Sequence, residues 1–228
     1  MPKVLISDAM DSIAEKILTS NNIDVDVKTD FTIEELLVKI EQYDGLIVRS
    51  ATKVTKEIIE SAKNLKIIGR AGAGVDNIDL VSAKENKIIV MNTPGGNTNA
   101  TAEHTLALLM SLSRKISIAD SSTHKGEWAK KKLKGNEIKG KTIGIIGFGN
   151  VGRRFAEICH VLGLKVLVVS KLFTAVKEQY PEYSSCDLSE VLQKADIISL
   201  HCKPNIDGSS VIASKELNLM KKTSFIIN

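Results

Sequence analysis

The sequence predicts an α/β protein of two domains, each built on a parallel β-sheet. Apolar strand-like runs alternate with helix-like stretches along both halves of the 228-residue chain, the pattern of a sheet covered by helices. A turn-rich segment, Asn-Thr-Pro-Gly-Gly at residues 92–96, interrupts this alternation. A glycine-rich turn at residues 147–152 stands between a strand and a helix of the second half. We therefore expect one domain at residues 1–98 and another at residues 99–228.

The spacing of apolar residues predicts each element of the first domain in turn. Residues 4–6 are a short apolar run typical of a strand, and Ile13, Ile17 and Leu18 share one helical face within residues 8–20. Similar apolar runs predict further strands at residues 24–28, 45–48, 65–69 and 88–90. Similar helical spacing predicts helices at residues 32–41, 56–62 and 79–85.

A longer helix is expected at residues 100–119, where Asn99 or Thr98 can cap its start. Its apolar stripe consists of Leu106, Leu109, Leu112, Ile116 and Ile118. Residues 121–140 are polar and lysine-rich around the lone Trp128, and we expect them to form a connecting arm.

The second domain repeats the alternation of strands and helices. Strands are expected at residues 141–146, 165–169, 196–200 and 224–227, and helices at residues 151–162, 188–194 and 214–220. The second domain has about four expected strands, whereas a dinucleotide-binding sheet has about six. We therefore expect the second domain to be incomplete at its C-terminus.

Composition narrows the classes of partner. The hydrophobic share of 43%, the charged share of 25% and the net charge of +4 are typical of globular proteins. The cluster Lys130-Lys131-Lys132 with Lys134 lacks an accompanying nucleic-acid motif, so we interpret it as solvated surface and expect no nucleic-acid partner. No apolar run approaches the ~20 residues of a membrane span, and no targeting segment precedes the first strand. We expect no membrane partner.

The three cysteines, Cys159, Cys186 and Cys202, are widely spaced and odd in number. This pattern fits neither a disulfide framework nor a zinc site. We therefore expect no metal site and a cytoplasmic location.

The motif Gly147-Phe148-Gly149-Asn150-Val151-Gly152 carries the strongest local chemistry. It follows the apolar strand at residues 143–146 and precedes an amphipathic helix, which is the context that gives such a motif meaning. The first glycine allows a tight turn, the second lets the backbone approach a pyrophosphate, and the third lets the helix pack on the strand. Free N–H groups at the helix start then receive the phosphates. The motif predicts a bound dinucleotide.

The choice between NAD and NADP stays open. NAD-binding versions carry an acidic residue about 20 residues further on, whereas this chain has Val169-Ser170-Lys171 there. Lys171 can attract a ribose 2′-phosphate, which favours NADP. Alternatively, Lys171 is simply exposed and the ribose of NAD is held elsewhere.

The chain resembles the D-isomer-specific 2-hydroxyacid dehydrogenases, and within that family the phosphoglycerate dehydrogenase branch. The resemblance implies a flavodoxin-like substrate domain followed by a Rossmann-type dinucleotide-binding domain. It runs through nearly the whole chain in a shared order of motifs. The matching stretches are residues 48–55, 69–79, 92–94, 97–98, 102–104, 126–128, 147–152 and 195–201.

The resemblance also implies where substrate is held. The N–H groups of Ala73, Gly74 and Val75 would receive its carboxylate, and a glycine-flanked turn can converge several such donors on an anion. Arg49 or Arg70 would face a substrate phosphate, since the planar guanidinium binds phosphate at two points. The alternative is that these arginines brace the domain's own carboxylates. The implied substrate contacts are Arg49, Ser50, Arg70, Ala73, Gly74, Val75 and Asn97.

The implied cofactor contacts include the glycine motif, the residues after the second strand of the second domain, and a cysteine after its third strand. They are Ala73, Thr101, Gly147, Gly149, Asn150, Val151, Gly152, Ser170, Lys171 and Cys202. Cys202-Lys203-Pro204 departs from the family's usual tripeptide at this point.

The activity implied is hydride transfer between NAD(P) and a D-2-hydroxy acid, foremost the conversion of 3-phosphoglycerate to 3-phosphohydroxypyruvate in serine biosynthesis. The family's catalytic arginine, glutamate and histidine are expected after Asn228, so we assign no catalytic residue and expect this chain alone to be inactive. The four histidines present are interpreted as surface or packing residues.

Two alternatives remain beside this activity. One is another substrate of the same chemistry, as in a glyoxylate or hydroxypyruvate reductase or a D-lactate-type dehydrogenase. The other is a non-catalytic, NAD(H)-sensing protein of the corepressor kind. A homodimer joined through the cofactor domain is implied by the resemblance, with the helix from Ala100 and the arm around Trp128 as its contact surface.

Overall fold

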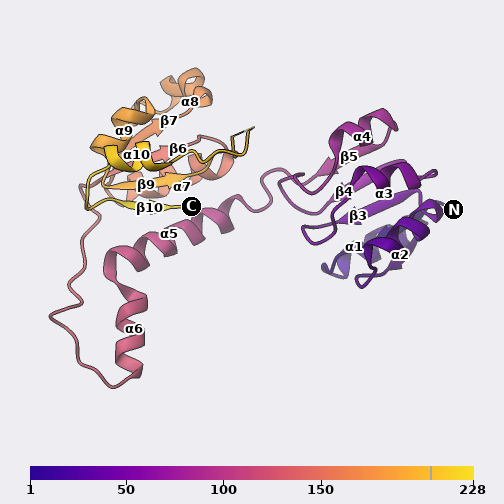
Figure 1. The fold of residues 1–228 in the computed structure, drawn as a ribbon, viewed down its shortest axis with the longest axis horizontal. Helices are drawn as coiled ribbons and strands as arrows, with labels where there is room; N and C mark the ends of the chain where they lie inside the picture. Colours follow the sequence, from indigo (N-terminus) through magenta and orange to yellow (C-terminus); the bar gives the residue numbers. More distant parts are fainter. Residues whose placement is uncertain (206) are drawn as a thin grey trace. The chain divides into compact units, whose positions relative to one another are not determined.

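The computed structural model describes residues 1–205 and 207–228, which form two compact units, Met1–Asn97 and Thr98–Asn228 (Figure 1). Each unit carries its own parallel sheet with helices on its faces. The expected α/β class is confirmed.

The first unit contains five parallel strands in the order β2-β1-β3-β4-β5. This is the flavodoxin-like order. Its core is formed by strand residues such as Leu5, Leu46 and Ile68, with Ile40 and Ile58 from the helical side. The strands are β1 (Lys3–Ile6), β2 (Asp24–Val27), β3 (Gly45–Val48), β4 (Ile67–Arg70) and β5 (Ile89–Asn92). The helices are α1 (Ile13–Ser20), α2 (Ile33–Lys39), η1 (Ile40–Gln42), α3 (Lys56–Ser61) and α4 (Leu80–Glu85).

Side-chain caps explain where α2 and α4 of the first unit begin. Thr32 and Glu35 form a capping box at α2, in which each side chain accepts a hydrogen bond from the other residue's N–H. Asp79 caps α4 by accepting from the N–H of Ser82. The first helix begins later than the expected residue 8, because Asp8 is engaged elsewhere in the unit.

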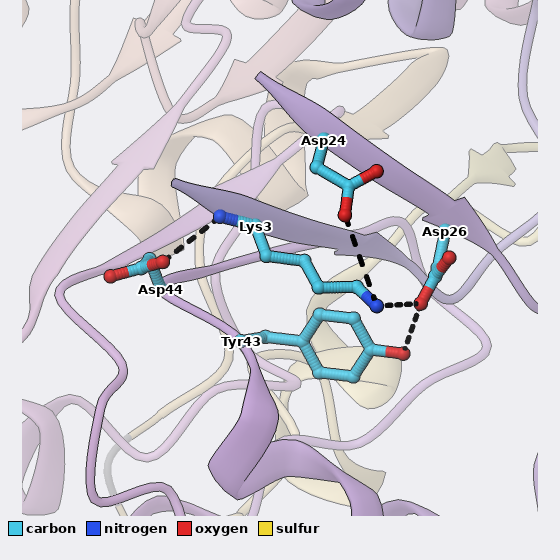
Figure 2. Close-up of polar contacts among 5 residues, drawn as sticks. All are labelled: Lys3, Asp24, Asp26, Tyr43 and Asp44. Atoms are coloured by element: carbon cyan, nitrogen blue, oxygen red, sulfur yellow. Dashed lines mark hydrogen bonds and ion pairs between the residues drawn. The ribbon is translucent and has the colours of Figure 1, made fainter. Parts of the chain in front are cut away.

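A polar network joins the amino ends of the first three strands (Figure 2). The Lys3 ammonium lies 2.9 Å from the Asp26 carboxylate, and the Tyr43 hydroxyl donates to the same carboxylate at 2.8 Å. The Asp44 carboxylate accepts from the Lys3 N–H at 2.9 Å. Lys3 and Tyr43 hold the pKa of Asp26 below its usual value, while burial and then Asp26 raise the pKa of Tyr43 to about 12. This network stabilises the end of the sheet opposite to the loops described below.

The second unit has a five-stranded parallel sheet in the order β10-β9-β6-β7-β8. Numbered within the unit and read from the β8 edge, this is 3-2-1-4-5, the strand order of the dinucleotide-binding fold. Its strands are β6 (Thr142–Ile146), β7 (Lys165–Val169), β8 (Ser184–Ser185), β9 (Ile197–Leu200) and β10 (Phe225–Ile227). Its helices are α5 (Thr98–Arg114), α6 (Ile116–His124), α7 (Asn150–Val161), α8 (Lys171–Val176), η2 (Lys177–Gln179), α9 (Leu188–Lys194) and α10 (Ser214–Leu219).

The expectation of about four strands in this sheet was wrong. A fifth strand, β8, pairs with β7, but its two serines leave no apolar run to detect. Helix α8 and turn η2, which precede β8, were also missed. Cys202 consequently follows the fourth strand of the unit rather than the third.

The expected single helix at residues 100–119 is two helices. Lys115 adopts the left-handed conformation, φ 53°, and separates α5 from α6. The irregular arm therefore begins after His124 rather than at residue 121. Within the apolar stripe, Leu109 is buried against the core and α5 packs on α7, whereas Ile116 and Ile118 on α6 are exposed. Among the described residues, no helix combines the length and apolarity that crossing a membrane requires.

Candidate functional site

In the glycine loop of the second unit, two glycines leave no room for a side chain and the third faces open space. Gly147 has φ 98°, and a Cβ placed on it would lie 2.5 Å from the carbonyl oxygen of His201. A Cβ on Gly152 would collide with the carbonyl oxygen of Gly147. Gly149 meets no atom within 4 Å, so space next to the loop is open. The loop therefore turns tightly, packs closely against α7 and leaves one approach free.

The start of α7 presents backbone hydrogen-bond donors beside that space. Gly149 is the N-cap residue, and within the described residues no side chain caps the helix. Asn150 is exposed, and the half-buried Val151 follows it in the first turn. The N–H groups and partial positive charge of a helix start attract phosphate, so the arrangement suits a pyrophosphate.

An aromatic cluster anchors the loop through Phe148. Phe148 is fully buried and contacts Phe173 and Tyr180 edge to face, with ring centroids 4.8 Å and 5.2 Å away. The Arg153 guanidinium lies over the Phe148 ring at 5.7 Å. The loop therefore has little freedom to rearrange.

His201 supports the same loop from β9. Its N–H donates to the carbonyl of Ile146 at 2.7 Å, and its imidazole Nε2 lies 2.9 Å from the Ser199 hydroxyl. Burial lowers the pKa of His201 to about 4, so the ring is neutral near pH 7. It packs on Phe155. The interpretation of His201 as a packing histidine agrees with these contacts.

The residues expected around the adenosine ribose lie at the carboxyl ends of β7 and β9. The Ser170 hydroxyl accepts from the N–H of Leu172 at 3.2 Å and caps α8. Lys171 is exposed, and Cys202 is an exposed free cysteine. Cys202 borders a cavity of about 600 Å³ that also reaches Ile226 of β10. Thr101 is half-buried in the first turn of α5.

In the first unit, the turn after β4 presents a set of free amides. Asn92 donates to the carbonyl of Ala73 at 2.7 Å and fixes the turn, and Val75 accepts from the N–H of Ile78. Within residues 1–205 and 207–228 the N–H groups of Ala73, Gly74 and Val75 have no acceptor. Three amides in one turn can bind an anion.

Asp8 organises the loop after β3 that carries Arg49 and Ser50. Its buried carboxylate accepts from the Arg49 N–H at 2.5 Å and from the Thr52 hydroxyl at 2.6 Å. Burial by itself raises the pKa of Asp8, but the hydrogen bonds from Thr52 and Arg49 together outweigh it and hold the pKa below its usual value. Asp8 is therefore ionised at pH 7.

Asn77 connects this loop to the turn after β4. Its side-chain oxygen accepts from Arg70 Nε at 2.8 Å, and its side-chain nitrogen donates to the Arg49 carbonyl at 2.8 Å. Sequence reasoning missed both Asp8 and Asn77, although Asn77 lies within a stretch that carried the family resemblance.

The two arginines do not brace carboxylates in the described part of the chain. Arg49 donates to the Ala9 carbonyl at 3.1 Å, and Arg70 donates to Asn77. Neither guanidinium has an acidic partner among the described residues, and that of Arg70 lies next to Gly72 in the turn that carries the free amides. Ser50 is exposed after Arg49, and Asn97 is exposed as the last residue of the unit.

The fold and the glycine loop define a Rossmann-type dinucleotide-binding unit that follows a flavodoxin-like unit. Comparison with protein families matches residues 4–223 to the D-isomer specific 2-hydroxyacid dehydrogenase, catalytic domain. The chain belongs to this family, and the resemblance stated from the sequence is confirmed.

Individual relatives agree with this assignment. D-3-phosphoglycerate dehydrogenase from Archaeoglobus fulgidus is 39% identical over 226 residues, which are 99% of this chain and 43% of that protein. The chain spans about two-fifths of the length of the curated relatives it matches.

Solved structures of the same fold carry nicotinamide cofactors. The NAD⁺-bound 3-phosphoglycerate dehydrogenase of Entamoeba histolytica superposes with a TM-score of 0.80 at 30% identity, covering 99% of this chain and 70% of that one. An acyclic imino acid reductase in complex with NADPH and D-Arg gives a TM-score of 0.86 at 33% identity, covering 98% and 73%.

Proposed function

We propose that the chain binds a nicotinamide dinucleotide on its glycine loop and a D-2-hydroxy acid on the turn after β4, as the binding part of a dehydrogenase. The glycine loop carries the proposal, because its open side at Gly149 adjoins the start of α7, which no side chain caps. When bound, the nicotinamide ring supplies the hydride acceptor for oxidation of the hydroxy acid. We assign the proton-accepting base to no residue of this chain.

The proposed substrate is 3-phosphoglycerate. The amides of Ala73, Gly74 and Val75 would hold its carboxylate, and Arg49 or Arg70 would hold its phosphate. Relatives named D-3-phosphoglycerate dehydrogenase support this choice, as does the lack of acidic partners for either arginine among the described residues. Two-point binding by a guanidinium explains why arginine suits a phosphate here.

The proposed cofactor is NAD, with NADP as a second candidate. The exposed Lys171 favours NADP, since no carboxylate in Val169-Ser170-Lys171 would repel a ribose 2′-phosphate. The imino acid reductase with NADPH is a precedent within the fold.

Calorimetric titration with NADH and NADPH tests the cofactor site. We expect one of them to bind in the micromolar range, and Gly149→Ala to weaken binding at least tenfold by adding a methyl group where phosphate approaches. Gly69→Ala serves as the control, because its Cβ would meet only ordinary contact at 3.7 Å in another unit. Failure of both nucleotides to bind at millimolar concentration contradicts the proposal.

Titration with D-3-phosphoglycerate and with D-glycerate tests the substrate. We expect the phosphorylated acid to bind at least tenfold more tightly, and Arg70→Met to remove most of that difference. Equal binding of the two acids would contradict the choice of 3-phosphoglycerate and would favour a 2-hydroxy acid without a phosphate group as the substrate.

We also propose a homodimer joined through the cofactor unit. Ile116 and Ile118 of α6 are 52% and 60% exposed, and Trp128 of the arm is 88% exposed. Association would remove these apolar side chains from water. Sedimentation of the wild-type chain and of Ile118→Asp tests this, with Val161→Asp on the exposed end of α7 as the control. A monomeric wild type contradicts it.

A further inference from the structure

The loops that follow β1, β2 and β3 enclose a crevice that none of the assignments above uses. Its volume is about 370 Å³, within the range of small-molecule sites. Its walls include Ser7, Thr29, Phe31, Leu36, Thr52 and Lys53. The proposed substrate contacts are other residues, in the loops after β3 and β4 and at the end of the unit.

The crevice lies at the point where the order of the sheet reverses direction. The chain passes from β1 to β2 on one side and then crosses to β3 on the other side of β1. In open parallel sheets, ligands bind outside the carboxyl ends of the strands at such a switch point, because the two adjoining loops diverge there. Ser7 follows β1 directly, and Thr52 and Lys53 come from the loop after β3.

Asp8 preforms one wall of the crevice. Its carboxylate accepts from the Arg49 N–H, the Thr52 N–H and the Thr52 hydroxyl, and so ties the loop after β1 to the loop after β3. A carboxylate has about four acceptor sites, which these bonds nearly fill. Asp8 therefore fixes the wall and keeps little capacity for binding a ligand itself.

Lys53 and Thr29 are the polar side chains of the wall that remain available to a ligand, and the ammonium of Lys53 offsets the charge of the hydrogen-bonded Asp8. The Lys53 ammonium is exposed, and within residues 1–205 and 207–228 it has no ion pair. The Thr29 hydroxyl likewise has no hydrogen bond in that part of the chain. Phe31 and Leu36, from the segment after β2, supply an apolar surface that continues into the core of the unit.

We propose that this crevice binds a small organic acid with a short apolar tail. The carboxylate lies against Lys53 and Thr29, and the tail packs on Phe31 and Leu36. The site is distinct from the amides at residues 73–75 and from the glycine loop, so it does not depend on the proposed function.

Titration of the whole chain with 4-methylpentanoate, followed by saturation-transfer NMR, tests the proposal. We expect Lys53→Met to weaken binding at least tenfold and Phe31→Ala at least fivefold. Lys39→Met, which removes an exposed lysine from the other end of α2, should bind as the wild type does. The neutral analogue 4-methylpentanamide should bind at least tenfold more weakly than the acid.

The proposal is overturned if the wild type does not bind 4-methylpentanoate, if Lys53→Met binds it undiminished, if the amide binds equally well, or if D-3-phosphoglycerate displaces the acid. Circular dichroism checks the fold of each variant. If Phe31→Ala is unfolded, Thr29→Val replaces it, because that variant keeps the shape of the wall and loses only the hydroxyl. We expect Thr29→Val to weaken binding about threefold, and unchanged binding counts against the site.

Discussion

The carbonyl oxygen of Gly147 occupies the place where a Cβ of Gly152 would stand. The two glycines thus bring the first turn of α7 against the end of β6. The gap cannot widen easily, because Phe148 between them is buried in the aromatic cluster. We propose that close packing and cofactor access are separate properties of one loop, with Gly152 responsible for packing and Gly149 for access.

Gly152→Ala should destabilise the second unit by about 1–3 kcal/mol, the usual cost of overpacking a tight contact. Urea unfolding followed by circular dichroism measures this. Gly149→Ala is the matched comparison: its methyl group meets no atom, so its only cost is the poorer N-cap that alanine provides, and it should lose less stability than Gly152→Ala while losing nucleotide affinity. Equal stability of the two variants would contradict this division of roles.

Asp8→Asn should destabilise the first unit by about 1–3 kcal/mol at pH 7, because an amide replaces one carboxylate oxygen by a donor facing N–H groups. The folded-state pKa of Asp8 is lowered, so its contribution is present above the unfolded pKa near 3.8 and is lost as pH falls through the folded value. Urea unfolding at pH 7 and pH 3 measures both effects. The penalty of Asp8→Asn should shrink at the lower pH, and a constant penalty would argue against an ionised Asp8.

His201 should remain neutral in the folded chain down to about pH 4, because burial lowers its pKa to about 4. The unfolded chain binds that proton near pH 6.5, so stability should decline as pH falls from about 6.5 to 4. Imidazole NMR shifts report the pKa directly. His201→Gln should flatten the decline. A His201 pKa near 6.5 would contradict the buried placement.

Lys171→Asp should shift the cofactor preference towards NADH, because a carboxylate repels a 2′-phosphate and accepts hydrogen bonds from the ribose of NAD. We expect NADPH affinity to fall at least tenfold, which corresponds to about 1.4 kcal/mol. Calorimetry with both nucleotides measures it. Lys177→Asp, in the exposed η2 turn, changes charge equally and should leave the ratio unaltered.

Most of the fold follows from local sequence patterns, and the exceptions have physical reasons. Strands such as β3 and β6 are continuous apolar runs, whereas β8 is two exposed serines that pair with β7 without an apolar signal. The left-handed Lys115 that ends α5 has no signal either, since lysine ordinarily continues a helix.

In the candidate sites, too, some residues could be predicted from the sequence and others could not. The glycine loop was predictable because its three glycines lie within six consecutive residues and a task could be assigned to each glycine. Asp8 was not, because its partner Arg49 lies 41 residues away. Asn77 was missed for the same reason, as it reaches back 28 residues to the carbonyl of Arg49. Such contacts exist only once the strands are aligned in the sheet.

The donors at the start of α7 and in the turn at residues 73–75 belong to peptide groups. A peptide N–H cannot be removed by replacing a side chain, except by proline. If both places bind anions as proposed, the side chains around them can diverge widely among descendants while that binding persists, provided that the small residues shaping the backbone are retained. Evolutionary change in ligand preference would then be concentrated at side chains such as Lys171 and Arg70.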